Sequence, residues 1–183
     1  MFNSLKTNVA LLMQSPKDYL YSFVYSDNSK VEIRRFDPRS VAAAEKLIKK
    51  LKRLCPKITV VLIGSVGLGI DGRGDIDLCA CAAKTKLPVY YRRITKNFGK
   101  PVKIRSEFRQ WEFERNGFPV ELYLSNTKDQ RFKEQVRLFN LLKNNPAYLR
   151  EYQSIKRLMN HGSEREYVLR RMEFFNRISG QRQ

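Results

Sequence analysis

The sequence predicts an α/β body of about 128 residues followed by a C-terminal extension built from helices. Two observations carry this prediction. Up to residue 128, apolar runs with strand length and β-branched composition alternate with amphipathic segments. From Asp129 onward, apolar residues recur at helical spacing. We therefore expect residues 1–128 to form the body and residues 129–183 an extension packed on it as a single unit.

The first elements are predicted from alternation and from helix-capping residues. Aromatic residues at alternate positions favour two strands within residues 17–36; they are Tyr19, Tyr21, Phe23 and Tyr25. Residues 37–40, Asp-Pro-Arg-Ser, include types that cap helices. Apolar residues then share one helical face, namely Leu47, Ile48, Leu51 and Leu54. We expect a helix to about Leu54, ended by Pro56.

The middle of the chain predicts two strands and a helix. Residues 58–63 are apolar apart from Thr59 and rich in β-branched types, which is typical of a central strand. A glycine-rich turn follows, and residues 75–82 have the pattern of a partner strand. A basic helical stretch is expected around residues 89–98.

A β-hairpin is predicted around Asn116-Gly117, which is the strongest short hairpin signal in the sequence. One strand would run from Val102 to about Arg115 and the other over residues 118–124. Counting outward from a two-residue turn pairs Phe113 with Val120, Glu112 with Glu121 and Trp111 with Leu122. Three helices should follow, because apolar residues repeat at helical spacing in groups that begin at Phe132, Tyr148 and Tyr167.

The charge of the chain indicates a polyanionic partner. The 183 residues include 36 Lys or Arg and 18 Asp or Glu, for a formal net charge of +18. Such an excess attracts nucleic acids and nucleotides. Hydrophobic residues reach 42%, which argues against disorder, and no apolar run approaches the length of a membrane span. With three cysteines and no signal-peptide pattern, we expect a soluble, cytoplasmic protein with reduced thiols and no membrane partner.

The segment from Val60 to Leu78 contains the residues with the clearest chemical meaning. A buried strand runs into Gly64-Ser65, where small residues let backbone amides and a hydroxyl approach a phosphate. Asp75 and Asp77 then occupy alternate positions of the next strand, so both carboxylates project from one face. Adjacent carboxylates repel unless a cation or proton joins them. Because no zinc-like Cys/His set is present, Mg²⁺ or Mn²⁺ is the expected partner.

A third acid is expected on the hairpin. Glu121 is flanked by Val120 and Leu122, as expected where a buried strand presents one carboxylate to a cleft. Glu112 would lie directly across from Glu121. Because two like charges in that position repel, we expect a basic side chain or a metal ion near them. Glu121 is the preferred third ligand, and Glu112 remains the alternative.

These residues resemble the polymerase-β-type nucleotidyltransferase superfamily, which combines Gly-Ser, a short glycine-rich interval, Asp-x-Asp on a strand and a later lone acid. The C-terminal helices resemble the GrpB-like (UPF0157) branch, through Phe139-Asn140-Leu141-Leu142-Lys143, Asn145-Pro146, Glu151-Tyr152 and Lys156-Arg157-Leu158. The resemblance implies an α/β (α+β) nucleotidyltransferase-fold mixed sheet flanked by helices, with the active cleft at the Gly-Ser turn. Unlike the usual GrpB pattern, with its single Asp, this sequence has Asp75, Asp77 and Glu121, the set of active nucleotidyltransferases.

The superfamily's chemistry implies a role for each candidate residue. Asp75, Asp77 and Glu121 would be the catalytic and metal-binding acids for two Mg²⁺ or Mn²⁺ ions. Five further residues would bind the nucleoside triphosphate: Gly64 and Ser65 at the β- and γ-phosphates, Arg73 and Lys156 beside the departing pyrophosphate, and Tyr152 stacked on the base.

These roles predict a metal-dependent nucleotidyltransferase that moves a nucleoside monophosphate from an NTP to an RNA acceptor. The charge favours RNA, and the superfamily favours tRNA. Two alternatives stay open: a transferase acting on a small molecule or a protein, and a non-catalytic RNA-binding module on the same fold. The transferred nucleotide and the oligomeric state are likewise open.

Overall fold

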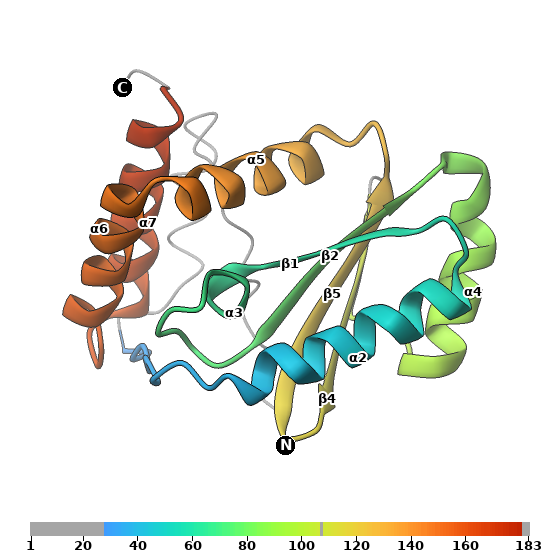
Figure 1. The fold of residues 1–183 in the computed structure, drawn as a ribbon, viewed down its shortest axis with the longest axis horizontal. Helices are drawn as coiled ribbons and strands as arrows, with labels where there is room; N and C mark the ends of the chain where they lie inside the picture. The colour runs from blue at the N-terminus through green and yellow to red at the C-terminus, as the bar shows by residue number, and fades with distance from the viewer. Residues whose placement is uncertain (1–27, 107, 181–183) are drawn as a thin grey trace. The chain divides into compact units, whose positions relative to one another are not determined.

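The computed structural model describes residues 28–106 and 108–180 (Figure 1). In chain order the elements are α2 (Arg39–Leu54), β1 (Thr59–Ile63), α3 (Gly64–Leu68), β2 (Ile76–Ala82), the 3-10 helix η1 (Lys84–Lys86), α4 (Leu87–Phe98), β3 (Lys103–Ile104), β4 (Phe108–Arg115), β5 (Phe118–Asn126), α5 (Gln130–Asn144), α6 (Pro146–Leu158) and α7 (Glu164–Ile178). The described residues separate into two compact units, one within residues 34–143 and one of residues 28–33 with 144–180.

The larger unit contains a five-stranded mixed sheet with strand order β1-β2-β5-β4-β3. β2 and β5 run parallel, whereas the β1–β2, β5–β4 and β4–β3 pairs are antiparallel. The hairpin register is the predicted one, with Glu112 opposite Glu121 and Trp111 opposite Leu122. Asn116 and Gly117 both have positive φ, which a tight two-residue hairpin turn requires. A mixed sheet flanked by helices confirms the predicted fold class.

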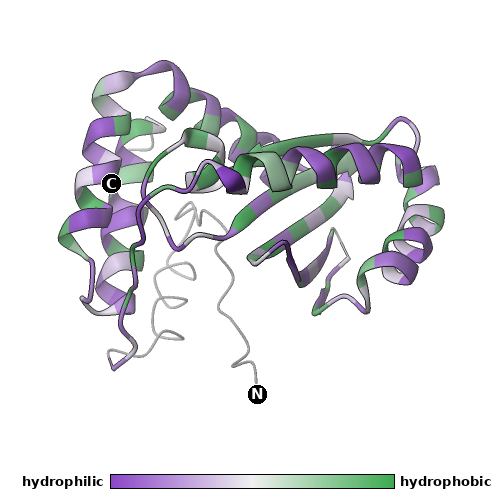
Figure 2. Cartoon of the chain, turned by 60° about the horizontal axis from the view of Figure 1, so that its bottom comes forward, coloured by the Kyte–Doolittle hydropathy of each residue, from purple (hydrophilic) through white to green (hydrophobic). Residues whose placement is uncertain are grey.

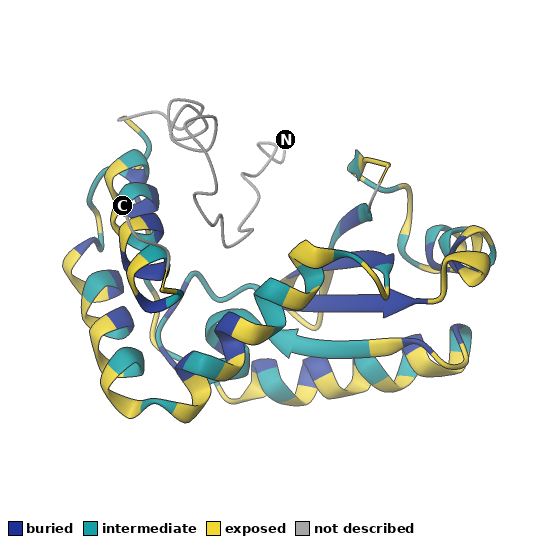
Figure 3. Ribbon diagram, turned by 90° about the horizontal axis from the view of Figure 1, so that it is seen from above, coloured by how far each residue is buried: buried dark blue, intermediate teal, exposed yellow. Residues whose placement is uncertain are grey.

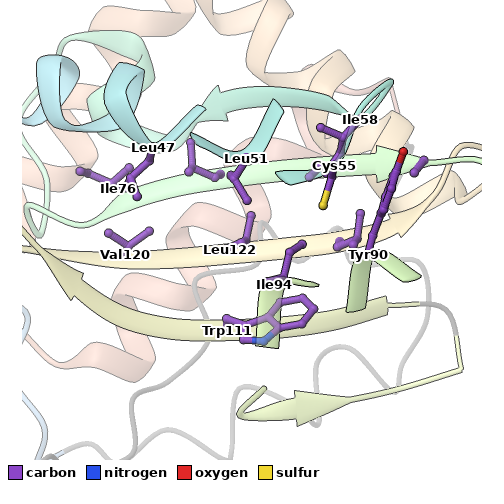
Figure 4. Packing of buried hydrophobic residues seen from close by; sticks show 14 of the residues in the cluster. Leu47, Leu51, Cys55, Ile58, Ile76, Tyr90, Ile94, Trp111, Val120 and Leu122 are labelled. Carbon is purple, nitrogen blue, oxygen red and sulfur yellow. The ribbon is translucent and has the colours of Figure 1, made fainter. Parts of the chain in front are cut away.

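One face of the sheet is covered by α2 and α4 and holds the hydrophobic core (Figure 4). Leu47 and Leu51 of α2 and Ile94 of α4 are almost completely buried there. They pack on alternate strand residues, among them Ile76 and Leu122. Because strand side chains alternate between faces, the residues between these core positions point to the opposite face of the sheet.

Helix α2 begins after Asp37, as the sequence predicted. The backbone N–H of Arg39 donates to Asp37 Oδ1 at 2.9 Å, and the N–H of Ser40 donates to the Asp37 carbonyl at 3.0 Å. Its buried residues lie on one side and its exposed residues on the other (Figure 3). Helix α4, which was expected over residues 89–98, likewise buries one side while its basic residues stay exposed.

Three predictions for the strands need correction. The apolar run over residues 58–63 forms β1, which lies at the end of the described strand order rather than at its centre; it is apolar because it is partly buried on both faces. The strand expected from Val102 to Arg115 is divided into β3 and β4, because the chain reverses where the Arg105 N–H donates to the Phe108 carbonyl. Residues 28–36 make isolated bridges instead of a strand. The alternating aromatics at 19–25 lie outside the described residues.

The smaller unit contains α6 and α7. Both begin at side-chain caps: Asn145 Oδ1 accepts from the N–H groups of Ala147 and Tyr148, and Ser163 Oγ accepts from the Glu166 N–H. Val31 hydrogen-bonds to the α6–α7 connection through Gly162 and His161. Figure 2 shows hydrophilic and hydrophobic residues alternating along the helices, as the helical spacing predicted. The three expected C-terminal helices are confirmed, while their packing as one unit with the body stays a prediction.

No helix within the described ranges has the length and apolar character needed to cross a bilayer.

Candidate active site

Three carboxylates form a row across three neighbouring strands. The parallel register of β2 and β5 places Asp77 opposite Glu121, and the hairpin places Glu112 opposite Glu121 on the other side. Residues in register on neighbouring strands point to the same face, so these acids share the face that α2 and α4 do not cover. Asp77 and Glu121 are both 7% exposed. The sheet therefore gathers acidic side chains in a largely dehydrated setting.

Gly64 packs against the carboxylate of Asp77. It has φ +67, and a Cβ atom built on it would lie 1.9 Å from Asp77 Oδ2. Both the conformation and the space therefore require glycine. Ser65 follows in the short helix α3, where its carbonyl accepts the Ile70 N–H at 3.1 Å. The predicted Gly-Ser turn and the second predicted aspartate are thus neighbours.

The electrostatic environment of Glu121 raises its pKa to about 7. Burial is the main cause, and the charges of Asp75 and Glu112 raise the pKa further. A hydrogen bond from the Tyr123 hydroxyl to Glu121 Oε2 and the charge of Arg73 act in the opposite direction. Asp75, immediately before β2, and Arg73, in the preceding loop, therefore both act on the same carboxyl group. Near pH 7 this group exists in comparable amounts with and without its proton.

Glu112 is held by its own strand. Gln110 Nε2 donates to Glu112 Oε1 at 2.7 Å, and Gln110 is fully buried. Burial raises the pKa of Glu112, whereas the charge of Lys103 and the Gln110 hydrogen bond lower it. This fixed position leaves Glu112 beside Glu121 as an alternative third acid, as the register of the hairpin predicted.

The donor chemistry of the site fits Mg²⁺ or Mn²⁺, because the row offers only carboxylate oxygens. A cation would also relieve the repulsion that raises the pKa of Glu121. However, no three His, Cys, Asp or Glu side chains among residues 28–106 and 108–180 converge closely enough to hold a metal ion. Strand register pairs Asp77 with Glu121, and a set of three carboxylates around one ion would need side-chain rotation.

Helix α5 crosses the acid-bearing face of the sheet. The thiol of Cys79, two residues after Asp77, donates to Gln135 Oε1 of α5 at 3.0 Å. Burial raises the pKa of this thiol, and the charge of Asp77 adds to the effect. Cys55, Cys79 and Cys81 are all free and buried.

Comparison with solved structures identifies the fold. The crystal structure of the conserved protein GrpB from Enterococcus faecalis matches 80% of this chain and 99% of its own, with a TM-score of 0.63 and 14% identity. The chain has the GrpB fold. The predicted GrpB-like resemblance is therefore confirmed at the level of the fold.

Two further solved structures match with lower TM-scores. A cytoplasmic RNA terminal U-transferase has a TM-score of 0.40 and 17% identity, over 76% of this chain and 45% of that one. Cid1 in complex with a UTP analogue has a TM-score of 0.38 and 17% identity, over 86% and 52%. No family model matches the sequence, and no curated protein does.

In this chain with the GrpB fold, Tyr152 and Lys156 belong to the smaller unit. The Tyr152 ring stacks on Phe174 with centroids 5.5 Å apart, and it is 5% exposed. Lys156 is equally buried; its Nζ donates to the Tyr167 hydroxyl at 3.2 Å and lies 4.9 Å from the Tyr152 ring centroid. To stack on a base, Tyr152 would have to leave this aromatic cluster. Their roles toward a nucleotide stay predictions.

Sequence reasoning missed Tyr123 and Gln110, which hold Glu121 and Glu112. A signal was present, because each lies two residues from its acid on a predicted strand and therefore on the same face. Strand alternation does not predict whether a neighbouring hydroxyl or amide forms a hydrogen bond with the acid, because that depends on the side-chain rotamers.

Proposed function

We propose that this protein is a metal-dependent nucleotidyltransferase that transfers a nucleoside monophosphate from an NTP to an RNA acceptor and releases pyrophosphate. The observation that carries the proposal is the row of acids on β2 and β5, with Asp77 packed on Gly64. Asp77 and Glu121 come from neighbouring strands, and Asp77 is buried against the backbone of Gly64. Burying two carboxylates side by side costs free energy unless a cation binds between them. The GrpB fold is compatible with this arrangement.

Asp75, Asp77 and Glu121 would hold the divalent cations, two Mg²⁺ or Mn²⁺ ions. When bound, such ions neutralise charge on the phosphates and lower the pKa of an attacking hydroxyl.

The protein's own residues would bind the triphosphate and move the proton. The acceptor hydroxyl oxygen would form a bond to the α-phosphorus while the bond from that phosphorus to the α–β bridging oxygen breaks, and pyrophosphate leaves. Glu121 would take the hydroxyl proton. Gly64 and Ser65 would contact the β- and γ-phosphates, and Arg73 would offset charge on the departing pyrophosphate.

An RNA acceptor is supported by the net charge of +18, which a small neutral or cationic acceptor would not require. Within RNA, tRNA is the first acceptor to test, as the superfamily resemblance suggests.

The test is incubation of the full chain with each labelled NTP, total RNA or tRNA, and Mg²⁺ or Mn²⁺. We expect label to enter RNA, and Asp77→Asn and Asp75→Asn to abolish incorporation. Glu114→Gln is a matched control, since Glu114 is an exposed acid at the end of β4. Label that enters a protein or a metabolite instead of RNA would contradict the proposed acceptor.

A second candidate is a non-catalytic RNA-binding module. It is favoured by the absence, within the described residues, of three converging metal ligands and by the hydrogen bond that occupies Glu121. Such a protein would bind RNA with steep salt dependence but release no pyrophosphate from any NTP in the presence of Mg²⁺ or Mn²⁺.

A further inference from the structure

We infer that the exposed face of α2 and α4 is the surface along which the RNA backbone binds, on the side of the sheet opposite the acids. This inference rests on the proposed function only in naming RNA as the macromolecule that the protein acts on. This surface, called the α2–α4 face, comprises the exposed side chains of α2, η1 and α4.

The α2–α4 face is richer in positive charge than the chain as a whole. Residues 84–98, which form η1 and α4, contain five Lys or Arg and no Asp or Glu. Helix α2 contains six Lys or Arg and one acid, Glu45. Asp77, Glu121 and Glu112 lie on the other face of the sheet. The α2–α4 face is thus basic, and the row of carboxylates lies on the opposite face of the sheet.

The two helices make one continuous surface. Lys50 Nζ of α2 lies 4.7 Å from the ring centroid of Phe98 in α4. Arg93 Nη1 of α4 donates to the Leu54 carbonyl at the end of α2 at 2.9 Å. Both helices pack on the same core, as Figure 4 shows for Leu51 and Ile94. Charges from two chain segments are therefore displayed together.

These charges are not neutralised by the rest of the described chain. Arginines on other helices are ion-paired, for example Arg170 with Glu166 at 2.7 Å. Among the described residues, the exposed basic side chains in the middle and at the end of α2 and along α4 make no ion pair; four of them are Lys49, Lys52, Arg92 and Lys96. Unpaired cations held close together repel, so a polyanion gains the most by binding there.

The chemistry of the face fits RNA rather than a membrane. The apolar residues of α2 and α4 point into the core, so these helices have no exposed large hydrophobic side chain to insert into lipid. Helix α2 is 16 residues long, about 24 Å at 1.5 Å per residue, which spans several phosphates. Beside it, Arg109 lies 4.0 Å from the Tyr91 ring centroid and adds a further half-exposed cation.

The test compares two variants of the full chain that each lose four positive charges. The face variant is Lys49→Gln, Lys52→Gln, Arg92→Gln and Lys96→Gln. The control variant is Lys128→Gln, Arg131→Gln, Lys133→Gln and Lys143→Gln, all exposed and in or beside α5 on the other side of the sheet. Binding of a labelled single-stranded RNA and of an RNA hairpin is measured by fluorescence anisotropy over a range of salt concentrations. Circular dichroism verifies that each variant is folded.

We expect the face variant to lose roughly tenfold to a hundredfold in affinity near physiological salt, and its salt slope to fall by about 2 to 3. The control variant should lose less than about threefold. Equal losses in the two variants would overturn the inference, because binding would then follow net charge alone. Tighter binding of wild type to phosphatidylglycerol vesicles than to RNA, lost in the face variant, would assign the face to a membrane and also overturn it.

The transfer assay separates this inference from the proposed function. If RNA is labelled, the face variant should raise KM for RNA and leave kcat unchanged. If no NTP is consumed but RNA binding still depends on the face, the proposed transferase is wrong and the inference stands. If RNA is labelled with the same KM in both variants, the inference is wrong and the transferase stands.

Discussion

The carboxylate of Asp77 lies against the backbone of Gly64, so closely that a Cβ atom at Gly64 would be 1.9 Å from Oδ2 and 2.8 Å from Cγ. Gly64 follows the end of β1 and Asp77 is the second residue of β2, and the antiparallel register pairs Asp77 with the preceding residue, Ile63. The glycine-serine turn and the acid are therefore one local structure, so a change in either should disturb the other.

Gly64→Ala should be more destabilising than Gly69→Ala. Both glycines have left-handed backbones, with φ +67 and +68, so both variants carry similar strain, about 1 to 2 kcal/mol. Only at position 64 would the new methyl group collide with Asp77; at position 69 no atom lies within 4 Å. We expect Gly64→Ala to lose roughly 2 kcal/mol more in urea denaturation, and also to lose transfer activity. Equal losses would show that the contact with Asp77 is unimportant.

The stability of the wild-type protein should fall as pH rises from about 4.5 to 7. Burial and neighbouring acids raise the pKa of Glu121 from 4.5 to about 7, so the folded state keeps a proton that the unfolded state releases in this range. The loss should be on the order of 2 to 3 kcal/mol. Glu121→Gln should remove this dependence, whereas Glu114→Gln should keep it, as measured by urea denaturation at several pH values. An unchanged pH dependence in Glu121→Gln would refute the assignment.

Tyr123→Phe should raise the pKa of Glu121 further. The Tyr123 hydroxyl donates to Glu121 Oε2 and so stabilises the charged carboxylate; its removal favours the protonated form. The lower-pH limb of the transfer reaction, and the pH range in which stability falls, should both move to higher pH. Tyr148→Phe, on a half-buried tyrosine of α6, is the control. A shift to lower pH in Tyr123→Phe would contradict this role.

Mg²⁺ should stabilise the protein through the carboxylates. At pH 7.5, 10 mM Mg²⁺ at a Kd of about 1 mM would raise Tm by about 2 to 5 °C, since a ligand that binds the folded state shifts the unfolding equilibrium. Asp77→Asn should abolish the increase and Glu114→Gln should retain it, as measured by thermal denaturation with and without the metal. A wild-type Tm that does not respond to Mg²⁺ or Mn²⁺ would remove the metal from the proposed function.

Much of the local structure follows from the order of residues along the chain. Asn116-Gly117 sets the hairpin and its register, so Glu112 opposite Glu121 could be predicted by counting. Helical spacing predicted α2, α4 and the three C-terminal helices. The apolar run of β1 was misplaced at the sheet centre, because composition reports burial on two faces and not the position of a strand in the sheet.

By itself, the sequence determined which residues carry negative and positive charge, which of them alternate on a strand and which follow a helix repeat. Only the tertiary structure decided that β2 pairs in parallel with β5, so that Asp77 meets Glu121 from 44 residues away, and that Tyr123 bonds to that acid. The physical reason is range: turn conformation and periodicity act between residues close in the chain. Strand pairing and side-chain contacts depend instead on which surfaces the whole core brings together.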